Sequence, residues 1–246
     1  MESSQGAQPV YRFPKPLEEG LVLARPNRFI MTVRARGRTI RCHCPTTGRL
    51  GDLRIADIPC LFSRASGDAR KTRGTVEAIS LDPPEKQRKS WVGINQTAAN
   101  RYIEFFLRAG SMPEIASGPV RREVRLGASR IDFLVGSTYV EVKTPLIILP
   151  LAAGAKREGH SRFDSFDRLI KHMGELGSAL REGNRAAILM CYLYDAEPFK
   201  PPPMDSHNAP VILAAKRATE LGVERWQVNL RVEADGVRML RYFRNG

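Results

Sequence analysis

The 246-residue chain has no apolar run approaching the roughly 18–20 residues that a membrane-spanning helix needs. Its first residues, Met1-Glu2-Ser3-Ser4-Gln5, lack the basic and apolar parts of a secretion signal. Cysteine is scarce, and its four positions are too irregularly spaced for a disulfide framework: Cys42, Cys44, Cys60 and Cys191. The sequence therefore predicts a cytoplasmic protein with reduced thiols and no membrane partner.

Acidic residues are also few, with 26 Asp and Glu against 39 Lys and Arg, which leaves a net charge of +13. The isoelectric point is near 10.1. A basic protein of this size typically binds a polyanion, most often nucleic acid. A solvated basic surface or an acidic protein partner is the alternative at this point.

Aromatic residues make up 7% of the chain. Proteins that bind single strands commonly stack the bases on aromatic rings. The shortage argues mildly against base stacking as the main means of binding in this chain. RNA processing is therefore a weaker hypothesis for its function.

The chain divides into a tail and two domains in its composition. Residues 1–12 are expected to be a disordered tail, because they have little to bury. From 13 to 89, short β-type segments separated by turn residues predict a small antiparallel barrel; they span 21–23, 28–33, 39–44, 58–62 and 74–79. The polar, proline-marked stretch 83–89 is the expected boundary to a second domain over 90–246.

The first 90 residues alone carry a net charge of +8, from 17 Lys and Arg against 9 Asp and Glu. Five arginines gather around one hairpin and the loop after it: Arg34, Arg36, Arg38, Arg41 and Arg49. Guanidinium groups pair with phosphate and stack on bases, so the cluster predicts a nucleic-acid groove on the barrel. The alternative is that alternate strand residues simply face water.

The second domain mixes helical and strand-like segments. Helices are predicted over 97–108, 166–181 and 210–221, and strands over 120–126, 129–135, 138–143, 185–193 and 225–229. This order predicts an α/β (α+β) domain built in layers.

The hairpin over 129–143 is where we place the chemistry. Gly136-Ser137 is a two-residue turn signal, which would set Asp132 directly opposite Glu141 with Cβ atoms roughly 4.5–5.5 Å apart. Lys143 lies two residues beyond Glu141 and shares its face of the strand. The opposite face is assigned to the core: Ile131, Phe133, Val140 and Val142.

Two anions and one cation inside an apolar hairpin are costly unless something compensates them, and a divalent cation would. The carboxylates of Asp132 and Glu141 suit Mg²⁺ or Mn²⁺, which keep several waters and bind phosphate. Such a metal activates water, while Lys143 orients it or stabilises the transition state. The pattern predicts metal-dependent phosphodiester hydrolysis, with a surface ladder of ion pairs as the alternative.

A further ligand is expected from the helix over 97–108. Asn100 and Glu104 share one stripe of that helix with two apolar residues and could point at the carboxylates. Glu104 is therefore a candidate metal ligand, and a glutamate at the edge of the packed face is the alternative.

The order helix, three strands, helix, strand, with Asp132 and Glu141-Val142-Lys143, resembles the core of the restriction-endonuclease-like (PD-(D/E)xK) superfamily. A closer resemblance, from about residue 13 to 226, is to the sugar fermentation stimulation protein family (SfsA). The segments that carry it are Cys42–Leu50, Arg70–Thr72, Trp91–Asn95 with Asn100, Arg122–Val124, Ser129–Leu134, Tyr139–Lys143, Lys171–Leu176, Asp205 and Gly222–Glu224.

The resemblance implies an N-terminal OB-like barrel, a restriction-endonuclease-like domain, and binding of DNA more than RNA in a bacterial-type cytoplasm. It carries the active-site role onto Asp132, Glu141 and Lys143. It adds Glu123 as a further acid. Within or beside the matching segments, Lys71 is a candidate nucleic-acid contact, and Asn100 and Lys171 are candidates for support around the active site. His172, on an apolar helix, is interpreted as a core or supporting group, with a general base as the alternative. The family's Phe-Pro-Asp-Ala has only an offset counterpart near Asp164, so no role is carried onto that residue.

Two main hypotheses follow from the sequence. The first is a Mg²⁺- or Mn²⁺-dependent nuclease whose barrel holds nucleic acid while the hairpin cuts it. The second is a non-catalytic, largely sequence-nonspecific DNA-binding regulator, on a nuclease scaffold, of the sugar-metabolism genes that the family's name records. The intact acids and lysine favour the first. A homodimer is left open.

Overall fold

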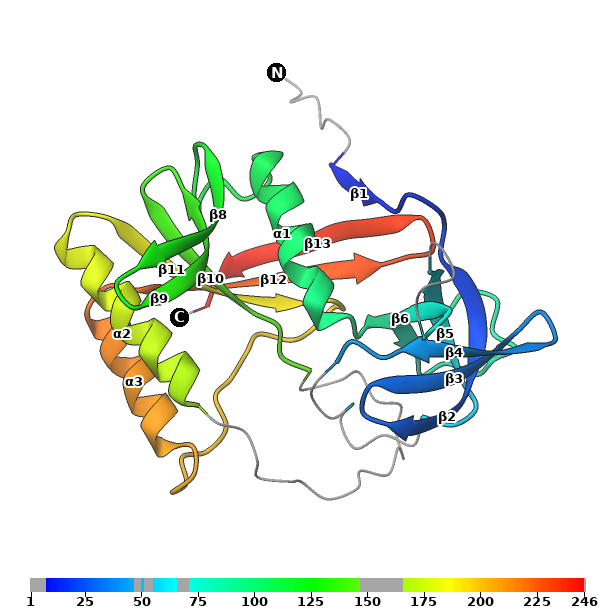
Figure 1. Cartoon of the computed structure of the whole chain (residues 1–246). Helices are drawn as coiled ribbons and strands as arrows, with labels where there is room; N and C mark the ends of the chain where they lie inside the picture. Colours follow the sequence, from blue (N-terminus) through cyan, green and yellow to red (C-terminus); the bar gives the residue numbers. More distant parts are fainter. Residues whose placement is uncertain (1–7, 47–49, 51–54, 66–70, 147–165, 246) are drawn as a thin grey trace.

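The computed structural model describes residues 8–46, 50, 55–65, 71–146 and 166–245, and within them the strands form two sheets (Figure 1). The predicted Arg49 contact and the departure at Asp164 lie outside these residues. No helix among them is long and apolar enough to span a bilayer.

The smaller sheet closes into a barrel. Its strands are β2 (Glu18–Asn27), β3 (Ile30–Ala35), β4 (Arg38–His43), β5 (Ile58–Arg64) and β6 (Gly74–Ser80). They run in the order β4-β3-β2-β5-β6, and β4 pairs with β6 to close the ring. Alternate residues point inward, as in β3, where Met31, Val33 and Ala35 are buried. The predicted barrel is confirmed.

The larger sheet has the order β1-β13-β12-β11-β10-β9-β8. Its strands are β1 (Val10–Arg12), β8 (Val120–Leu126), β9 (Ser129–Val135), β10 (Thr138–Lys143), β11 (Arg185–Tyr192), β12 (Glu224–Val232) and β13 (Gly236–Arg244). The central strands β10, β11 and β12 are parallel. Strand β11 is almost wholly buried, as its continuous apolar run predicts.

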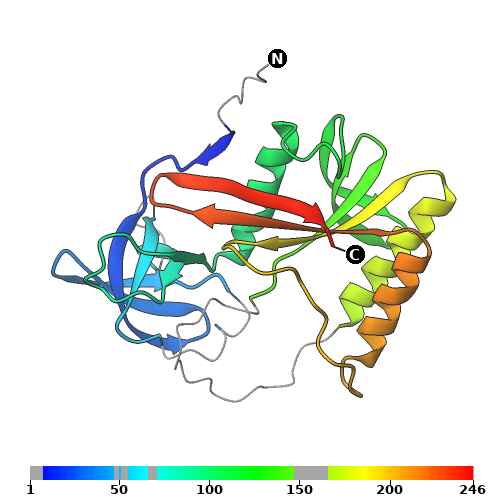
Figure 2. The same cartoon turned by 180° about the vertical axis from the view of Figure 1, so that it is seen from behind.

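Three helices cover this sheet. Helix α1 (Ala99–Arg108) packs Tyr102, Ile103 and Phe106 into a core shared with one face. Helices α2 (Asp167–Arg181) and α3 (Ala209–Glu220) lie side by side against the other face, in a separate core with Met173 and Leu176 (Figure 2). The predicted layered α/β domain is confirmed, with its helices within two residues of the expected ends.

The junction between the two sheets is closely packed. Strand β7 (Trp91–Gly93) pairs with β6, so the barrel sheet runs past the boundary expected at residue 89. The Gly93 N–H donates to the Leu193 carbonyl at 2.9 Å, and a Cβ at Gly93 would lie 2.4 Å from the Cβ of Leu193. Beyond it, Asn95 donates to the buried Glu77 at 2.6 Å and accepts from Ala98 N–H at the start of the helix. Barrel and sheet are therefore fixed against each other.

At the ends of the chain, one prediction was wrong and one strand was missed. Residues 10–12, expected in a disordered tail, form β1 and pair with β13, because Tyr11 packs edge-on against Tyr102 and Phe105. Strand β13 was not predicted at all. After the buried Gly236 and Val237, its residues are half-exposed or exposed and include three arginines. Its place is set by pairing with β12.

Candidate active site

The predicted hairpin is present, with its turn at Gly136 in the left-handed region (φ +57°). The β9–β10 ladder pairs Val135 with Thr138, Leu134 with Tyr139 and Phe133 with Val140, as the sequence predicts. The ladder ends there, however, and the expected rung from Asp132 to Glu141 is not among its pairs. The two strands open at the level of the acids.

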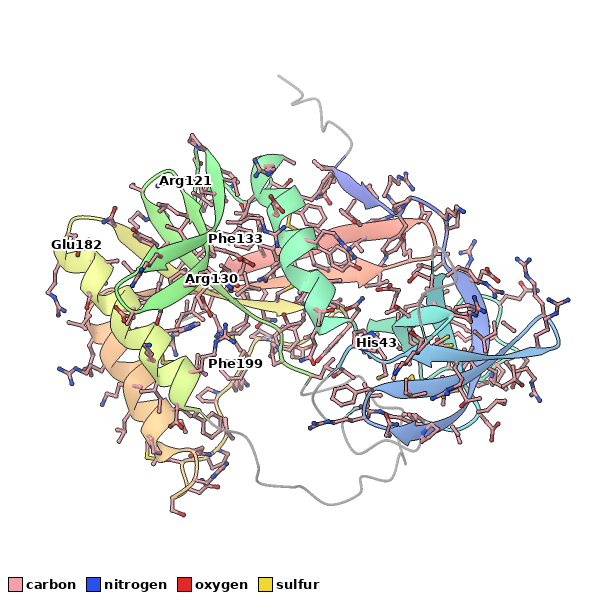
Figure 3. The ribbon with its side chains drawn as sticks, viewed as in Figure 1. His43, Arg121, Arg130, Phe133, Glu182 and Phe199 are labelled. Carbon is pink, nitrogen blue, oxygen red and sulfur yellow. The ribbon has the colours of Figure 1, made fainter. Side chains whose placement is uncertain are left out.

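The opening coincides with an irregularity on the other side of β9. The pairs Arg122–Phe133 and Val124–Ile131 flank it, while Glu123 between them has a strained φ of +49°. Ile131 belongs to the core under α2, whereas Phe133, labelled in Figure 3, belongs to the core under α1. Ile131 and Phe133 were expected on one face, and that expectation was wrong. A break in the ladder re-aims the side chain beside it, here Asp132.

Asp132 is held at both carboxylate oxygens. Asn100 of α1 donates to Oδ1 at 2.7 Å, and the backbone N–H of Val142 donates to Oδ2 at 2.8 Å. Burial raises the pKa of Asp132, and the nearby Glu141 raises it further, while the two hydrogen bonds and Lys143 act in the opposite direction. Asn100 therefore lies beside the acids, where the sequence analysis expected it.

Glu141 is nearly inaccessible, with 2% of its surface exposed. Its Oε1 accepts a hydrogen bond from Lys143 Nζ at 2.6 Å and contacts Nδ1 of the buried His172 on α2. The second oxygen, Oε2, is buried and has no hydrogen-bond partner among the described residues.

The acids open onto a cleft of about 400 Å³, whose lining includes Gln96, Asp132, Glu141, Lys143, Thr144 and Arg168. On one side the cleft adjoins the barrel, because Thr46 donates to Gln96 at 2.7 Å and Gln96 donates to the Thr144 carbonyl at 2.5 Å. The sequence analysis missed Gln96 and Arg168. Arg168 lies four residues before His172, about one helical turn away. This spacing places both residues on one face of the helix and could have identified Arg168 from the sequence.

A divalent cation fits these residues. Mg²⁺ is commonly bound by one or two carboxylates, with waters and substrate phosphate completing its shell. Asp132 and Glu141 supply two carboxylates at the edge of an open cleft, and the buried Oε2 lacks any other partner in the described part of the chain. An unpaired buried carboxylate oxygen is costly, and cation binding would remove that cost.

The larger predicted ligand set is not assembled. Glu104 pairs with Arg108 at 3.0 Å and with Arg122 at 3.1 Å, so its charge is neutralised by arginines of α1 and β8. Glu123 is more than half exposed and lies 3.4 Å from Arg130. Among the described residues no group of three or more Asp, Glu, His or Cys is arranged to hold a metal ion. The expectation that Glu104 and Glu123 join the acids was therefore wrong for this conformation.

The remaining predicted residues are spread over both domains. Lys171 donates to the Ala128 carbonyl at 3.1 Å and does not line the cleft, so its expected support of the active site is not seen. The barrel cations are exposed on β3, β4 and the segments beside them: Arg34, Arg36, Arg38, Arg41 and Lys71. Arg36 also lies 3.7 Å from Glu18. These side chains are accessible to a polyanion.

A closed barrel joined to an α/β sheet with an acid–acid–lysine hairpin defines a two-domain protein of the OB and restriction-endonuclease-like class. Residues 23–94 match the SfsA N-terminal OB domain, and residues 97–236 match the sugar fermentation stimulation protein RE domain. The chain belongs to the SfsA, or sugar fermentation stimulation protein, family.

Relatives match over nearly the full length. A sugar fermentation stimulation protein homolog of a Synechococcus strain is 31% identical over 98% of this chain and 97% of its own. One from Methylobacterium nodulans is 32% identical over 94% and 97%. Among solved structures, Pyrococcus furiosus SfsA in complex with Ca²⁺ is similar, with a TM-score of 0.73, 25% identity, and coverage of 96% and 98%.

Proposed function

We propose that this protein is a divalent-metal-dependent phosphodiesterase that acts on nucleic acid, DNA more than RNA, in the cytoplasm. The observation that carries the proposal is the buried Oε2 of Glu141, which has no partner in the described ranges of the chain and lies beside Asp132 in an open cleft. The Ca²⁺ in the similar Pyrococcus furiosus structure supports a hard cation here, and Mg²⁺ or Mn²⁺ is the ion we assign.

The residues at the cleft divide the work of this reaction between cation binding, charge stabilisation and positioning. Asp132 and Glu141 would hold the cation, which when bound would supply a water of lowered pKa and positive charge near the phosphate. Lys143 lies at the cleft with its Nζ on Glu141, where its ammonium group can stabilise negative charge that develops on the phosphate oxygens. Asn100 and His172 fix the two carboxylates in place.

The test is cleavage of labelled duplex DNA, single-stranded DNA and RNA, with and without Mn²⁺. We expect metal-dependent cleavage that Asp132→Asn abolishes while binding persists. Glu141→Gln should act in the same way, and Glu104→Gln is the matched control because Glu104 is held by two arginines away from the cleft. Unchanged cleavage by Asp132→Asn would refute the assignment.

A second candidate function is supported by one observation. The cleft brings together two carboxylates and no third in the described residues, which is a sparse set for catalysis. On that reading the protein is a non-catalytic DNA-binding regulator that keeps the nuclease scaffold. It predicts salt-sensitive binding of DNA with no cleavage under any divalent metal.

A further inference from the structure

Two arginines stand directly opposite each other on the hairpin that carries Asp132. Arg125 of β8 and Arg130 of β9 are register partners, which places their Cβ atoms roughly 4.5–5.5 Å apart on one face. Like charges in this position repel and destabilise a sheet. Both side chains are exposed (Arg130 is labelled in Figure 3). The arrangement costs stability and needs a reason.

The protein contains a second such pair, and it is compensated differently. Arg231 and Arg238 are partners across β12 and β13, and Glu233 lies 2.6 Å from Arg238 and 4.0 Å from Arg231. Asp235 adds a second carboxylate 3.4 Å from Arg238. At the β8–β9 pair, Glu123 lies 3.4 Å from Arg130, and both side chains are more than half exposed, so solvent weakens that contact. Arg125 donates to the Gly127 carbonyl at 3.4 Å.

The pair is also well placed relative to the cleft. Arg130 precedes Asp132 by two residues, about 6.6 Å along a strand. The cleft also adjoins the barrel through Gln96 and Thr46. The strand that carries Asp132 therefore also carries one member of an exposed arginine pair.

We propose that Arg125 and Arg130 form a phosphate-binding pair for the backbone of a nucleic-acid duplex that crosses the cleft. The inference rests on the proposed nucleic-acid function and names the surface that holds the substrate beyond the cut site. Two guanidinium groups can each pair bidentately with phosphate oxygens, and a bound phosphate removes the repulsion between them. Phosphate contacts of this kind position the strand without reading its sequence.

The competing explanation is protection of an edge. Strand β8 is the last in the sheet, and charged side chains on an edge strand prevent pairing with another chain. That explanation predicts aggregation of a neutral variant with unchanged DNA affinity. The phosphate pair predicts weaker DNA binding by a variant that remains monodisperse.

The experiment measures affinity for a labelled DNA duplex over a range of salt, with EDTA present so that no cleavage occurs. For Arg125→Gln with Arg130→Gln we expect at least a tenfold loss of affinity and a salt slope smaller by about 1.8, for two lost phosphate contacts. The same variant should unfold at an equal or higher urea concentration, because the repulsion is gone. Arg231→Gln is the matched control and should bind as the unsubstituted protein does.

A charge-preserving variant separates binding from folding. Arg125→Lys with Arg130→Lys should keep most of the salt slope, and loss as complete as in the glutamine variant would overturn the proposal. Unchanged affinity and slope in the glutamine variant would overturn it too. Failure of the unsubstituted protein to bind duplex would instead overturn the nucleic-acid function itself, so the two failures are distinguishable.

Discussion

Asp132 reaches across the open end of the hairpin and accepts a hydrogen bond from the backbone N–H of Val142, 2.8 Å away. Val142 lies between Glu141 and Lys143, so the bond ties the acid of β9 to the strand segment that carries the other two groups. The β9–β10 ladder stops at Phe133 and Val140, one residue from Asp132 and two residues from Val142. A side chain thus replaces the missing ladder contact, and the strands separate enough to leave a cleft.

Removing the Lys143 ammonium should affect the chemical step more than binding. We expect Lys143→Gln to lower kcat by about 10²–10³, because a donor aimed at developing charge is lost. Mn²⁺ affinity and duplex affinity should change little. The measurement is single-turnover cleavage with saturating metal, and a variant with an unchanged rate would remove Lys143 from the mechanism.

The contact between His172 and Glu141 predicts a role in metal affinity. His172→Leu leaves Oε1 with Lys143 alone and frees the carboxylate to rotate. Loss of such a supporting hydrogen bond typically costs 10–100-fold in metal affinity or activity. Titration of Mn²⁺ by calorimetry checks this, and His172→Gln, which retains a donor, should recover part of the loss. Equal affinity in all three proteins would argue that His172 only fills the core.

The raised pKa of Asp132 predicts a pH dependence of stability in metal-free protein. Because its pKa in the folded state lies above the ordinary value of 3.8, the folded state binds the proton more readily than the unfolded state. Stability contributed by this group therefore rises as pH falls from neutral toward 4. Asp132→Asn should lose this component, so its stability relative to the unsubstituted protein should decline on acidification. Urea unfolding at several pH values measures the difference, and parallel profiles would contradict it.

Gly93 predicts how firmly the two sheets are joined. An alanine there would place Cβ 2.4 Å from Leu193 Cβ and 2.8 Å from Val232 Cγ2, and such overpacking typically costs about 1–3 kcal/mol. We expect Gly93→Ala to lower the free energy of unfolding, measured by urea denaturation, by that amount. Gly174→Ala is the control, because nothing lies within 4 Å of its added Cβ and helix propensity favours alanine. If Gly93→Ala leaves the free energy of unfolding unchanged, the junction is looser than described.

The sequence predicted those features that depend on local pattern. The turn at Gly136, the three rungs beside it and the buried run of β11 all follow from turn chemistry and hydrophobic order. The layered domain and the closed barrel follow from the order of such segments. Local pattern therefore predicted the hairpin that carries Asp132, Glu141 and Lys143.

What the sequence could not give depends on contacts between distant segments. Glu104 of α1 forms an ion pair with Arg122 of β8. The spacing of residues along a helix cannot reveal a partner on a strand. The face switch between Ile131 and Phe133 arises from a break in the ladder with β8, which breaks the simple alternation of a strand. Strand β1 forms because Tyr11 finds aromatic partners on α1.

Binding of Mn²⁺ to the unsubstituted protein and to Glu141→Gln, measured by isothermal titration calorimetry beside the Glu104→Gln control, tests the central claim most directly. The account predicts that the unsubstituted protein and Glu104→Gln bind the ion alike, while Glu141→Gln loses binding because the buried Oε2 is replaced by an amide. Equal binding by Glu141→Gln and the unsubstituted protein would contradict it.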